Sequence, residues 1–189
     1  LAVVDHNLIL NHPALSEILV TQEEIENRVS EIGDLISKDY EGREPLLVGV
    51  LKGGVIFTTD LCRAIDLPVQ LDFMAVSSYG SSTTTSGVVR ILKDLDADIE
   101  GRDVILIEDI VDSGLTLRYL RKTLLARNPA SLVMCSLLVR EEAQDDLDDL
   151  IKYVGFQIPK VWVVGYGLDV SQRFRNLKDI WSYNTEADE

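Results

Sequence analysis

Two adjacent carboxylates, Glu108 and Asp109, follow four apolar residues in the stretch VILIEDIVDSGLT, which covers residues 104–116. Ionised carboxylate oxygens only accept hydrogen bonds, so such a pair suits ribose hydroxyls or a hard cation such as Mg²⁺. The alternative is a pair of exposed edge carboxylates, but solvated acids need no buried strand beneath them. We therefore interpret Glu108 and Asp109 as a candidate site for a diol or a metal ion.

Small hydroxyl side chains surround a glycine directly after this pair. Ser113 and Thr116 supply hydroxyl groups, and Gly114 lets the backbone approach a ligand closely. A helix is expected to begin here, and free N–H groups at a helix start bind anions. Because the GxxxxGK[ST] pattern of a Walker A loop is absent, we expect a monophosphate held without a lysine. The alternative is an ordinary turn in which Ser113 caps the helix.

These residues need a scaffold that brings several loops together. Apolar runs that alternate with amphipathic segments are typical of a parallel sheet covered by helices, so the fold class is α/β. A capping box of Thr21 and Glu24 starts the first helix, whose buried face should carry Ile25, Val29, Ile32 and Ile36. Strands are expected at 46–51, 69–79, 88–95, 104–110 and 131–139, and helices at 21–40, from 55 to about 65, and around 117–124.

Charged residues follow four of the apolar runs, and in one of them a glycine comes next. Lys52 and Gly53 follow LLVGVL, the carboxylate pair follows VILI, Arg140 follows SLLV, and Asp169 follows VWVVGYGL. In an open parallel sheet, ligands bind beyond the carboxyl ends of the strands. We therefore expect these four groups to meet at one edge of the sheet.

Composition narrows the class of protein. The chain has 189 residues, 46% of them hydrophobic and 26% charged, which indicates one globular domain. A net charge of −14 disfavours a nucleic-acid partner, and no apolar run approaches the ~20 residues of a membrane span. The first ten residues lack the pattern of a secretory signal, and Cys62 and Cys135 are expected to be unpaired buried thiols. We expect a cytoplasmic protein.

The stretch VILIEDIVDSGLT resembles the motif that binds phosphoribosyl pyrophosphate (PRPP) in type I phosphoribosyltransferases. From about residue 19 to 183, the chain is similar to the hypoxanthine-guanine (6-oxopurine) phosphoribosyltransferases. The resemblance implies a mainly parallel central sheet flanked by helices, with a small hood over the purine base. Within a single domain, 1–189, it implies a core at about 20–140, a hood from the N-terminal segment and about 150–184, and a mobile lid at about 78–88.

The resemblance assigns much of the PRPP site to one segment. It implies that Glu108 and Asp109 contact the ribose hydroxyls and a Mg²⁺ ion, and that Asp112 is the proton acceptor facing N7 of the purine. The residues of this segment that would bind PRPP and its 5-phosphate are Glu108, Asp109, Ile110, Val111, Asp112, Ser113, Gly114, Leu115 and Thr116.

Other motifs would complete the site. LKGG at 51–54 is similar to the family's pyrophosphate loop, in which the peptide before the lysine can be cis. Lys52, Gly53 and Arg175 would therefore bind pyrophosphate. SSYG at 77–80 would begin the lid, with Ser78 and Tyr79 closing over the site.

The segment around VGYGLD would form the purine pocket. The resemblance implies that Trp162 stacks on the base, that the backbone of Val163 reads its edge, and that Asp169 holds a second Mg²⁺ on pyrophosphate. The implied activity belongs to purine salvage: the phosphoribosyl group of PRPP is transferred to N9 of hypoxanthine or guanine, giving IMP or GMP and pyrophosphate. The resemblance also implies a homodimer or homotetramer.

Two residues depart from the family pattern. Arg140 stands where the family normally has a lysine that donates to the purine 6-oxo group, and arginine is larger and planar. We expect 6-oxopurine use to persist with an altered ranking of guanine, hypoxanthine and xanthine. Trp162 replaces a more common phenylalanine or tyrosine and keeps a stacking surface. The alternative is that Trp162 lies in the core and Val161 or Val163 faces the base.

Two other functions remain open. One is a regulator of the same fold that binds nucleotides or RNA without turnover, which the presence of Asp112, Lys52 and Arg175 and the net charge disfavour. The other is an enzyme of the same fold that acts on xanthine or a pyrimidine. The VGYGLD segment disfavours pyrimidines, whereas Arg140 leaves xanthine open.

Overall fold

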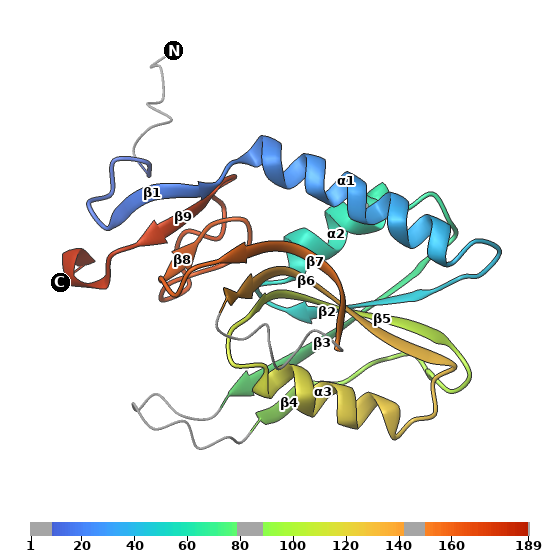
Figure 1. Cartoon of the computed structure of the whole chain (residues 1–189). Coiled ribbons are helices and arrows are strands. Elements are labelled where there is room, and N and C mark those ends of the chain that lie inside the picture. Colours follow the sequence, from blue (N-terminus) through green and yellow to red (C-terminus); the bar gives the residue numbers. More distant parts are fainter. Residues whose placement is uncertain (1–8, 79–88, 142–149, 189) are drawn as a thin grey trace, which may run out of the picture.

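A six-stranded sheet forms the centre of the computed structural model, which describes residues 9–78, 89–141 and 150–188. The strand order is β4-β3-β2-β5-β6-β7, and only the β3–β4 pair is antiparallel (Figure 1). The strands are β2 (Leu46–Leu51), β3 (Gln70–Ser78), β4 (Val89–Lys93), β5 (Asp103–Val111), β6 (Ser131–Arg140) and β7 (Ile151–Ile158). The expected α/β class with a mainly parallel sheet is confirmed.

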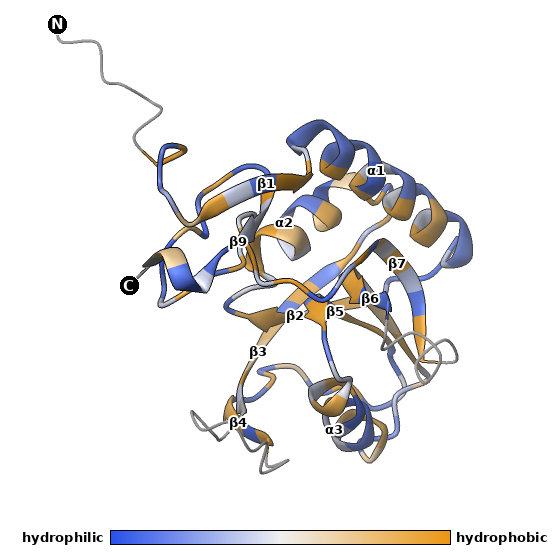
Figure 2. Ribbon diagram, turned by 60° about the vertical axis from the view of Figure 1, so that its left-hand side comes forward, coloured by the Kyte–Doolittle hydropathy of each residue, from blue (hydrophilic) through white to orange (hydrophobic). Residues whose placement is uncertain are grey.

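Helices cover both faces of this sheet. Helices α1 (Gln22–Asp39) and α2 (Val55–Ala64) lie on one face, and α3 (Leu115–Leu125) lies on the other (Figure 1). Successive strand residues point to opposite faces, so Leu47 packs in the cluster with α1 and α2, whereas Leu46 and Val48 pack in the cluster with α3. Figure 2 shows the central strands as mostly hydrophobic and the outward side of α1 as mostly hydrophilic. Burial on both faces explains the unbroken apolar runs.

The first helix begins as its sequence predicts. Thr21 is the N-cap, its hydroxyl accepts a hydrogen bond from Glu24 N at 3.3 Å, and Glu24 Oε2 accepts one from Thr21 N at 2.8 Å. This reciprocal pair is the predicted capping box. The helix residues that are buried are Ile25, Val29, Ile32, Gly33 and Ile36.

A second, three-stranded antiparallel sheet lies beside the carboxyl ends of the central strands (Figure 1). Its order is β1-β9-β8, from β1 (Leu15–Val20), β9 (Ile180–Tyr183) and β8 (Val163–Val164). The residues expected to form the hood, about 150–184, also include β7, which pairs with β6 in the central sheet. We keep the name hood for β1, β8, β9 and residues 159–179.

The expectation that Asp169 ends a strand of the central sheet is wrong. Only Val163 and Val164 of the run VWVVGYGL form a strand, and they pair with β9. The run then turns, with φ of +103° at Gly165, +48° at Tyr166 and +101° at Gly167. Two glycines permit this left-handed backbone, so an apolar run that resembles a buried strand becomes a turn of the hood.

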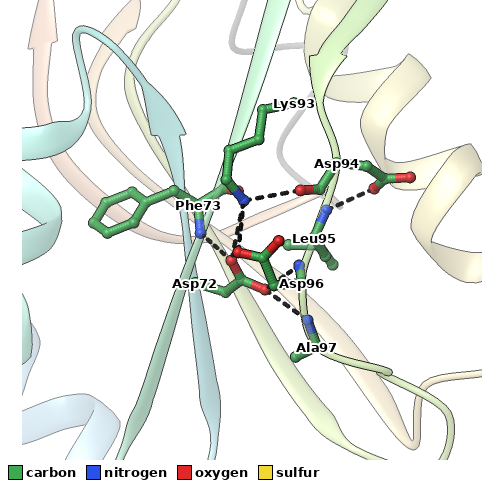
Figure 3. A network of polar contacts seen from close by, with 7 residues as sticks. All are labelled: Asp72, Phe73, Lys93, Asp94, Leu95, Asp96 and Ala97. Carbon is green, nitrogen blue, oxygen red and sulfur yellow. Dashed lines mark hydrogen bonds and ion pairs between the residues drawn. The ribbon is translucent and has the colours of Figure 1, made fainter.

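A buried aspartate on β3 fixes the turn that follows β4 (Figure 3). Asp72 is 8% exposed and accepts hydrogen bonds from the N–H groups of Phe73, Asp96 and Ala97 at 2.7–3.0 Å. Lys93 Nζ lies 3.6 Å from its carboxylate. Burial raises the pKa of Asp72, but these N–H groups and Lys93 outweigh it and hold the pKa below its usual value.

Both cysteines are free thiols, as expected, but the expectation that both are buried is wrong for Cys62. Cys135 is buried, and burial raises the pKa of its thiol, whereas Cys62 is half-buried. Within the described ranges, the helices are either too short or too polar to cross a membrane.

Candidate active site

Strand β5 carries the two adjacent carboxylates within its length, because it continues to Val111. This agrees with the strand expected at 104–110, and neighbouring strand residues point to opposite faces. Glu108 is 6% exposed, and its Oε1 has no hydrogen-bond partner among the described residues. Burial, with a smaller contribution from Asp109, raises the pKa of Glu108 well above its usual value. A buried oxygen without a partner fits a ligand that brings a hydroxyl group or a cation.

Asp109 lies against the segment that follows β2. A Cβ atom on Gly53 would stand 1.5 Å from Asp109 Oδ2, so a larger residue there would displace the Asp109 side chain. Burial raises the pKa of Asp109 to about 6, and nearby Asp169 adds to this, while backbone N–H groups and Arg175 oppose it. The two acids of the pair therefore have different surroundings.

The start of α3 is an open group of backbone donors. Gly114, at φ +72°, is the N-cap, and no side chain caps the helix, so the alternative in which Ser113 serves as the cap is wrong. Ser113 and Leu115 are exposed and Thr116 is half-buried, whereas Ile110 and Val111 still belong to β5. Uncapped N–H groups at the positive end of a helix can bind an anion.

The charged residues expected to bind pyrophosphate meet at one place. The Leu51–Lys52 peptide is cis, as the resemblance implies. Gln172 Oε1 accepts hydrogen bonds from Lys52 Nζ at 3.2 Å and from Arg175 Nη2 at 3.3 Å. Arg175 Nη2 also lies 2.6 Å from Asp169 Oδ1. Segments more than 100 residues apart thus form one charged cluster.

Gln172 is a member of this cluster that the sequence analysis missed. Its backbone N donates to Asp169 Oδ2 at 2.7 Å, and its φ is +65°. A left-handed glutamine in a polar loop has no recognisable pattern, so only the spacing of three from Asp169 to Gln172 and from Gln172 to Arg175 could have indicated it.

On the other side of the site, Arg140 joins Asp112 to the hood. Its Nε lies 3.3 Å from Asp112 Oδ1, and its Nη1 donates to the carbonyl oxygens of Pro159 at 2.7 Å and Val161 at 2.5 Å. The Arg140 side chain is 11% exposed, whereas that of Asp112 is 72% exposed. The candidate base is therefore open to solvent, and the arginine beside it is held in place.

The candidate stacking residue projects from the hood. Trp162 is 63% exposed, so the alternative that places it in the core is wrong. Val163 is buried in β8, and Trp162 O accepts a hydrogen bond from Tyr183 N at 2.8 Å. The expected lid lies outside the described residues except for the backbone of Ser78, which ends β3, and Tyr79 is not described.

The expected metal ligands Glu108, Asp109 and Asp169 do not form a closed cage. In the described part of the chain, no three His, Cys, Asp or Glu residues are grouped closely enough to enclose an ion. Mg²⁺ is usually held by one or two carboxylates together with water and substrate phosphates. The unpartnered oxygen of Glu108 and the buried carboxylate of Asp109 fit an ion that arrives with a phosphorylated substrate.

Known proteins are similar to this chain in sequence over most of its length. Residues 17–171 match the family model of the phosphoribosyl transferase domain. A hypoxanthine-guanine phosphoribosyltransferase of Mycobacterium bovis is 54% identical over 172 residues, which are 88% of this chain and 85% of that protein.

Solved structures agree with this match. A hypoxanthine phosphoribosyltransferase of Staphylococcus aureus superposes with a TM-score of 0.89 at 40% identity, covering 98% of this chain and all of that one. A Trypanosoma cruzi hypoxanthine phosphoribosyltransferase, solved to study how its C-terminal region affects oligomeric state and enzymatic activity, has a TM-score of 0.83 at 40% identity, covering 93% and 94% of the two chains. This chain therefore belongs to the hypoxanthine-guanine phosphoribosyltransferases, within the phosphoribosyl transferase domain family.

Proposed function

We propose that this protein transfers the phosphoribosyl group of PRPP to N9 of hypoxanthine or guanine, giving IMP or GMP and pyrophosphate in purine salvage. The observation that carries the proposal is the meeting, beyond the carboxyl ends of β2, β5 and β6, of a charged cluster, an uncapped helix start and an open aspartate. The names of the relatives supply the identity of the bases.

The PRPP side of the site would hold three parts of the substrate. The N–H groups around Ser113, Gly114, Leu115 and Thr116 would bind the 5-phosphate. Lys52, Gly53 and Arg175 would bind the pyrophosphate, and their pairing with Gln172 supports this role, because its carbonyl oxygen is the kind of acceptor that a phosphate oxygen would replace.

The purine side would supply the proton acceptor. As the bond from C1′ to pyrophosphate breaks and N9 bonds to C1′, the proton on N7 of the base would pass to the carboxylate of Asp112. The exposure of this carboxylate and its position beside Arg140 support the assignment. Arg140 would donate to the 6-oxo group, Trp162 would stack on the ring, and the backbone of Val163 would read its edge.

Magnesium fits the same site. We propose that Glu108 and Asp109 hold Mg²⁺ on the ribose side and that Asp169 holds a second ion on pyrophosphate. The metal would neutralise the charge that develops on the leaving group. The buried, unpartnered oxygen of Glu108 supports the first assignment.

Several broader properties stay predictions. We propose a single domain, 1–189, whose hood covers the purine and whose lid, at about 78–88, closes over PRPP to exclude water. A homodimer or homotetramer stays an expectation from the resemblance to the family. The net charge of −14 supports the absence of a nucleic-acid partner, and the cytoplasmic location remains an expectation from sequence.

Pyrophosphate release tests the proposal. The purified protein is given PRPP and Mg²⁺ with hypoxanthine, guanine, xanthine or adenine in turn, and each reaction is repeated with a chelator. We expect turnover with hypoxanthine or guanine that disappears without Mg²⁺. Binding of PRPP with no release for any base would favour the regulator instead, and turnover of xanthine alone would favour the enzyme with altered specificity.

A further inference from the structure

A buried tyrosine connects the hood to the helix that begins beside the pyrophosphate loop. Helix α2 starts at Val55, directly after Gly53 and its N-cap Gly54. One and a half turns further on, Asp60 Oδ2 accepts a hydrogen bond from the Tyr166 hydroxyl at 2.7 Å. Tyr166 is 8% exposed and stands 106 residues away in the chain. The bond therefore links α2 to the hood.

The backbone around Tyr166 also makes hydrogen bonds on the hood side of the charged cluster. Tyr166 N donates to Leu177 O at 2.8 Å, and Gly167 N donates to Arg175 O at 2.9 Å. Arg175 Nη1 returns a hydrogen bond to Gly167 O at 2.6 Å. These bonds tie the turn at Tyr166 to the segment that carries Arg175.

The same turn packs closely on the pyrophosphate loop. A Cβ atom on Gly167 would stand 2.1 Å from Gly53 O, so the two backbones are in direct contact. Any tilt of the hood about this contact would change the distance from Lys52 to Asp169 and Arg175. Tyr166 belongs to the apolar cluster that joins α1 and α2 to the hood, and its bond to Asp60 on α2 would oppose such a tilt.

We propose that Tyr166 and Asp60 form a positioning pair that sets the separation between Lys52–Gly53 and Asp169–Arg175, and so tunes the affinity of the site for the pyrophosphate group. The inference rests on the proposed function. Neither residue needs to touch the substrate, because both act through the Gly167–Gly53 contact and the bonds to Arg175.

The chemistry of the pair suits a permanent connection. Burial, followed by the Asp60 carboxylate, raises the pKa of Tyr166, so the phenol stays a donor throughout the neutral range. A hydroxyl that donates to a carboxylate makes a stronger bond than a neutral pair. Small displacements of binding groups weaken substrate binding and catalysis strongly, so a fixed separation has a direct functional effect.

Tyr166→Phe removes the hydroxyl and keeps the ring. We expect the KM for PRPP and the Kd for pyrophosphate, from titration calorimetry, to rise about tenfold, as for the loss of one hydrogen bond to a charged group. The KM for the purine should change less than twofold. Tyr153→Phe is the matched control, because its hydroxyl donates to Asp39 Oδ2, also at 2.7 Å, near the amino end of β7. This control should lose similar thermal stability without a change in the KM for PRPP.

Variants of Asp60 separate the bond from general packing. Asp60→Asn keeps an oxygen acceptor and should retain most of the affinity for pyrophosphate, whereas Asp60→Ala should match Tyr166→Phe. The double variant should be no worse than either single one. Equal changes in Tyr166→Phe and Tyr153→Phe, or additive effects in the double variant, would overturn the proposal.

Measurements on the wild-type protein and on Tyr166→Phe separate the positioning pair from the proposed function. A wild-type protein that neither binds pyrophosphate nor releases it from PRPP would contradict the function itself. A wild-type protein that is active, with Tyr166→Phe retaining wild-type affinity for PRPP and pyrophosphate, would contradict only the positioning pair. Should Tyr166→Phe not fold, the comparison of Asp60→Asn with Asp60→Ala measures the same effect.

Discussion

Among single residues, Arg140 has the most informative surroundings. Its guanidinium has acceptors on two sides, the carboxylate of Asp112 and the carbonyl oxygens of Pro159 and Val161. A lysine carries one compact ammonium group and cannot present a planar fork to separated acceptors. Arginine can therefore connect the candidate base to the hood.

Replacing this residue should alter the choice of base. Arg140→Lys places a smaller donor near the 6-oxo group and removes part of the connection to Pro159 and Val161. We expect hypoxanthine and guanine to remain substrates, with their kcat/KM ratio shifted about threefold to tenfold, the size of one changed hydrogen bond. Steady-state kinetics with guanine, hypoxanthine and xanthine measure this shift. Adenine turnover equal to that of hypoxanthine in the wild-type protein would contradict the role of Arg140 in reading a 6-oxo group.

Among the elements, the β3–β4 pair depends on Asp72. Three backbone N–H groups and Lys93 surround its carboxylate, so the turn after β4 is fixed to β3 (Figure 3). Strand β4 is the antiparallel edge of the sheet, where a neighbour on one side only leaves fewer hydrogen bonds to hold it. A buried, well-satisfied carboxylate compensates for that weakness.

The stability contributed by Asp72 should depend on pH. Its folded pKa is depressed, so its stabilisation is present above the unfolded pKa of about 4 and is lost as pH falls through the folded value. We expect Asp72→Asn to lower the free energy of unfolding by about 1–3 kcal/mol at pH 7, and by less near pH 3. Urea unfolding at several pH values measures the difference.

A matched control lies in the same loop. Asp98 is exposed and accepts one hydrogen bond, from Glu100 N at 3.1 Å, which an asparagine oxygen can also accept. Asp98→Asn should change the unfolding free energy by less than about 0.5 kcal/mol. Equal losses in both variants, or a loss in Asp72→Asn that is the same at pH 3 and pH 7, would contradict the account of the β3–β4 connection.

At the scale of the whole molecule, the site lies between the central sheet and the hood. Lys52 and Asp112 follow central strands, whereas Asp169 and Arg175 lie in the hood, and the charged cluster spans both. A ligand that contacts both units should therefore stabilise the entire fold. The net charge of −14 opposes an anionic ligand, so neutralisation by a metal should matter.

Thermal unfolding tests this coupling. We expect PRPP with Mg²⁺ at about 100 times its Kd to stabilise the protein by roughly 2.7 kcal/mol, and PRPP with a chelator to stabilise it much less. Differential scanning calorimetry measures both. An equal rise in Tm with and without Mg²⁺ would show that the carboxylates Glu108, Asp109 and Asp169 do not act through a metal.

Local patterns in the sequence predict the central sheet well. The capping box of α1 and the apolar runs of β2 and β6 appear in the structure at the expected residues, because the box joins neighbours in the chain and an unbroken apolar run suits a strand that is buried on both faces. The hood is less predictable. The run VWVVGYGL looks like a buried strand, and only its left-handed turn at Gly165–Gly167, fixed by contacts with Asp179 and Gly53, shows otherwise.

The candidate site was predictable to the extent that it lies at strand ends. The order of strands in a parallel sheet brings Lys52, Asp109, Asp112 and Arg140 to one edge, so their meeting could be expected. Gln172 and the Asp60–Tyr166 bond could not be found in this way, because they depend on how the hood is placed against α2. Apart from the spacing of three residues from Asp169 to Gln172 and from Gln172 to Arg175, the order of residues along the chain gives no sign of that placement.

The most direct test of the central claim, that Asp112 at this edge accepts the proton of the purine, is the kcat of Asp112→Asn with hypoxanthine at saturating PRPP and Mg²⁺. We predict a fall of about 10²–10⁴, the usual contribution of a general base, with the Kd for PRPP within about threefold of wild type. Asp98→Asn, which lies in the loop before β5, should keep wild-type kcat. A kcat of Asp112→Asn close to wild type would contradict the assignment of Asp112 as the base.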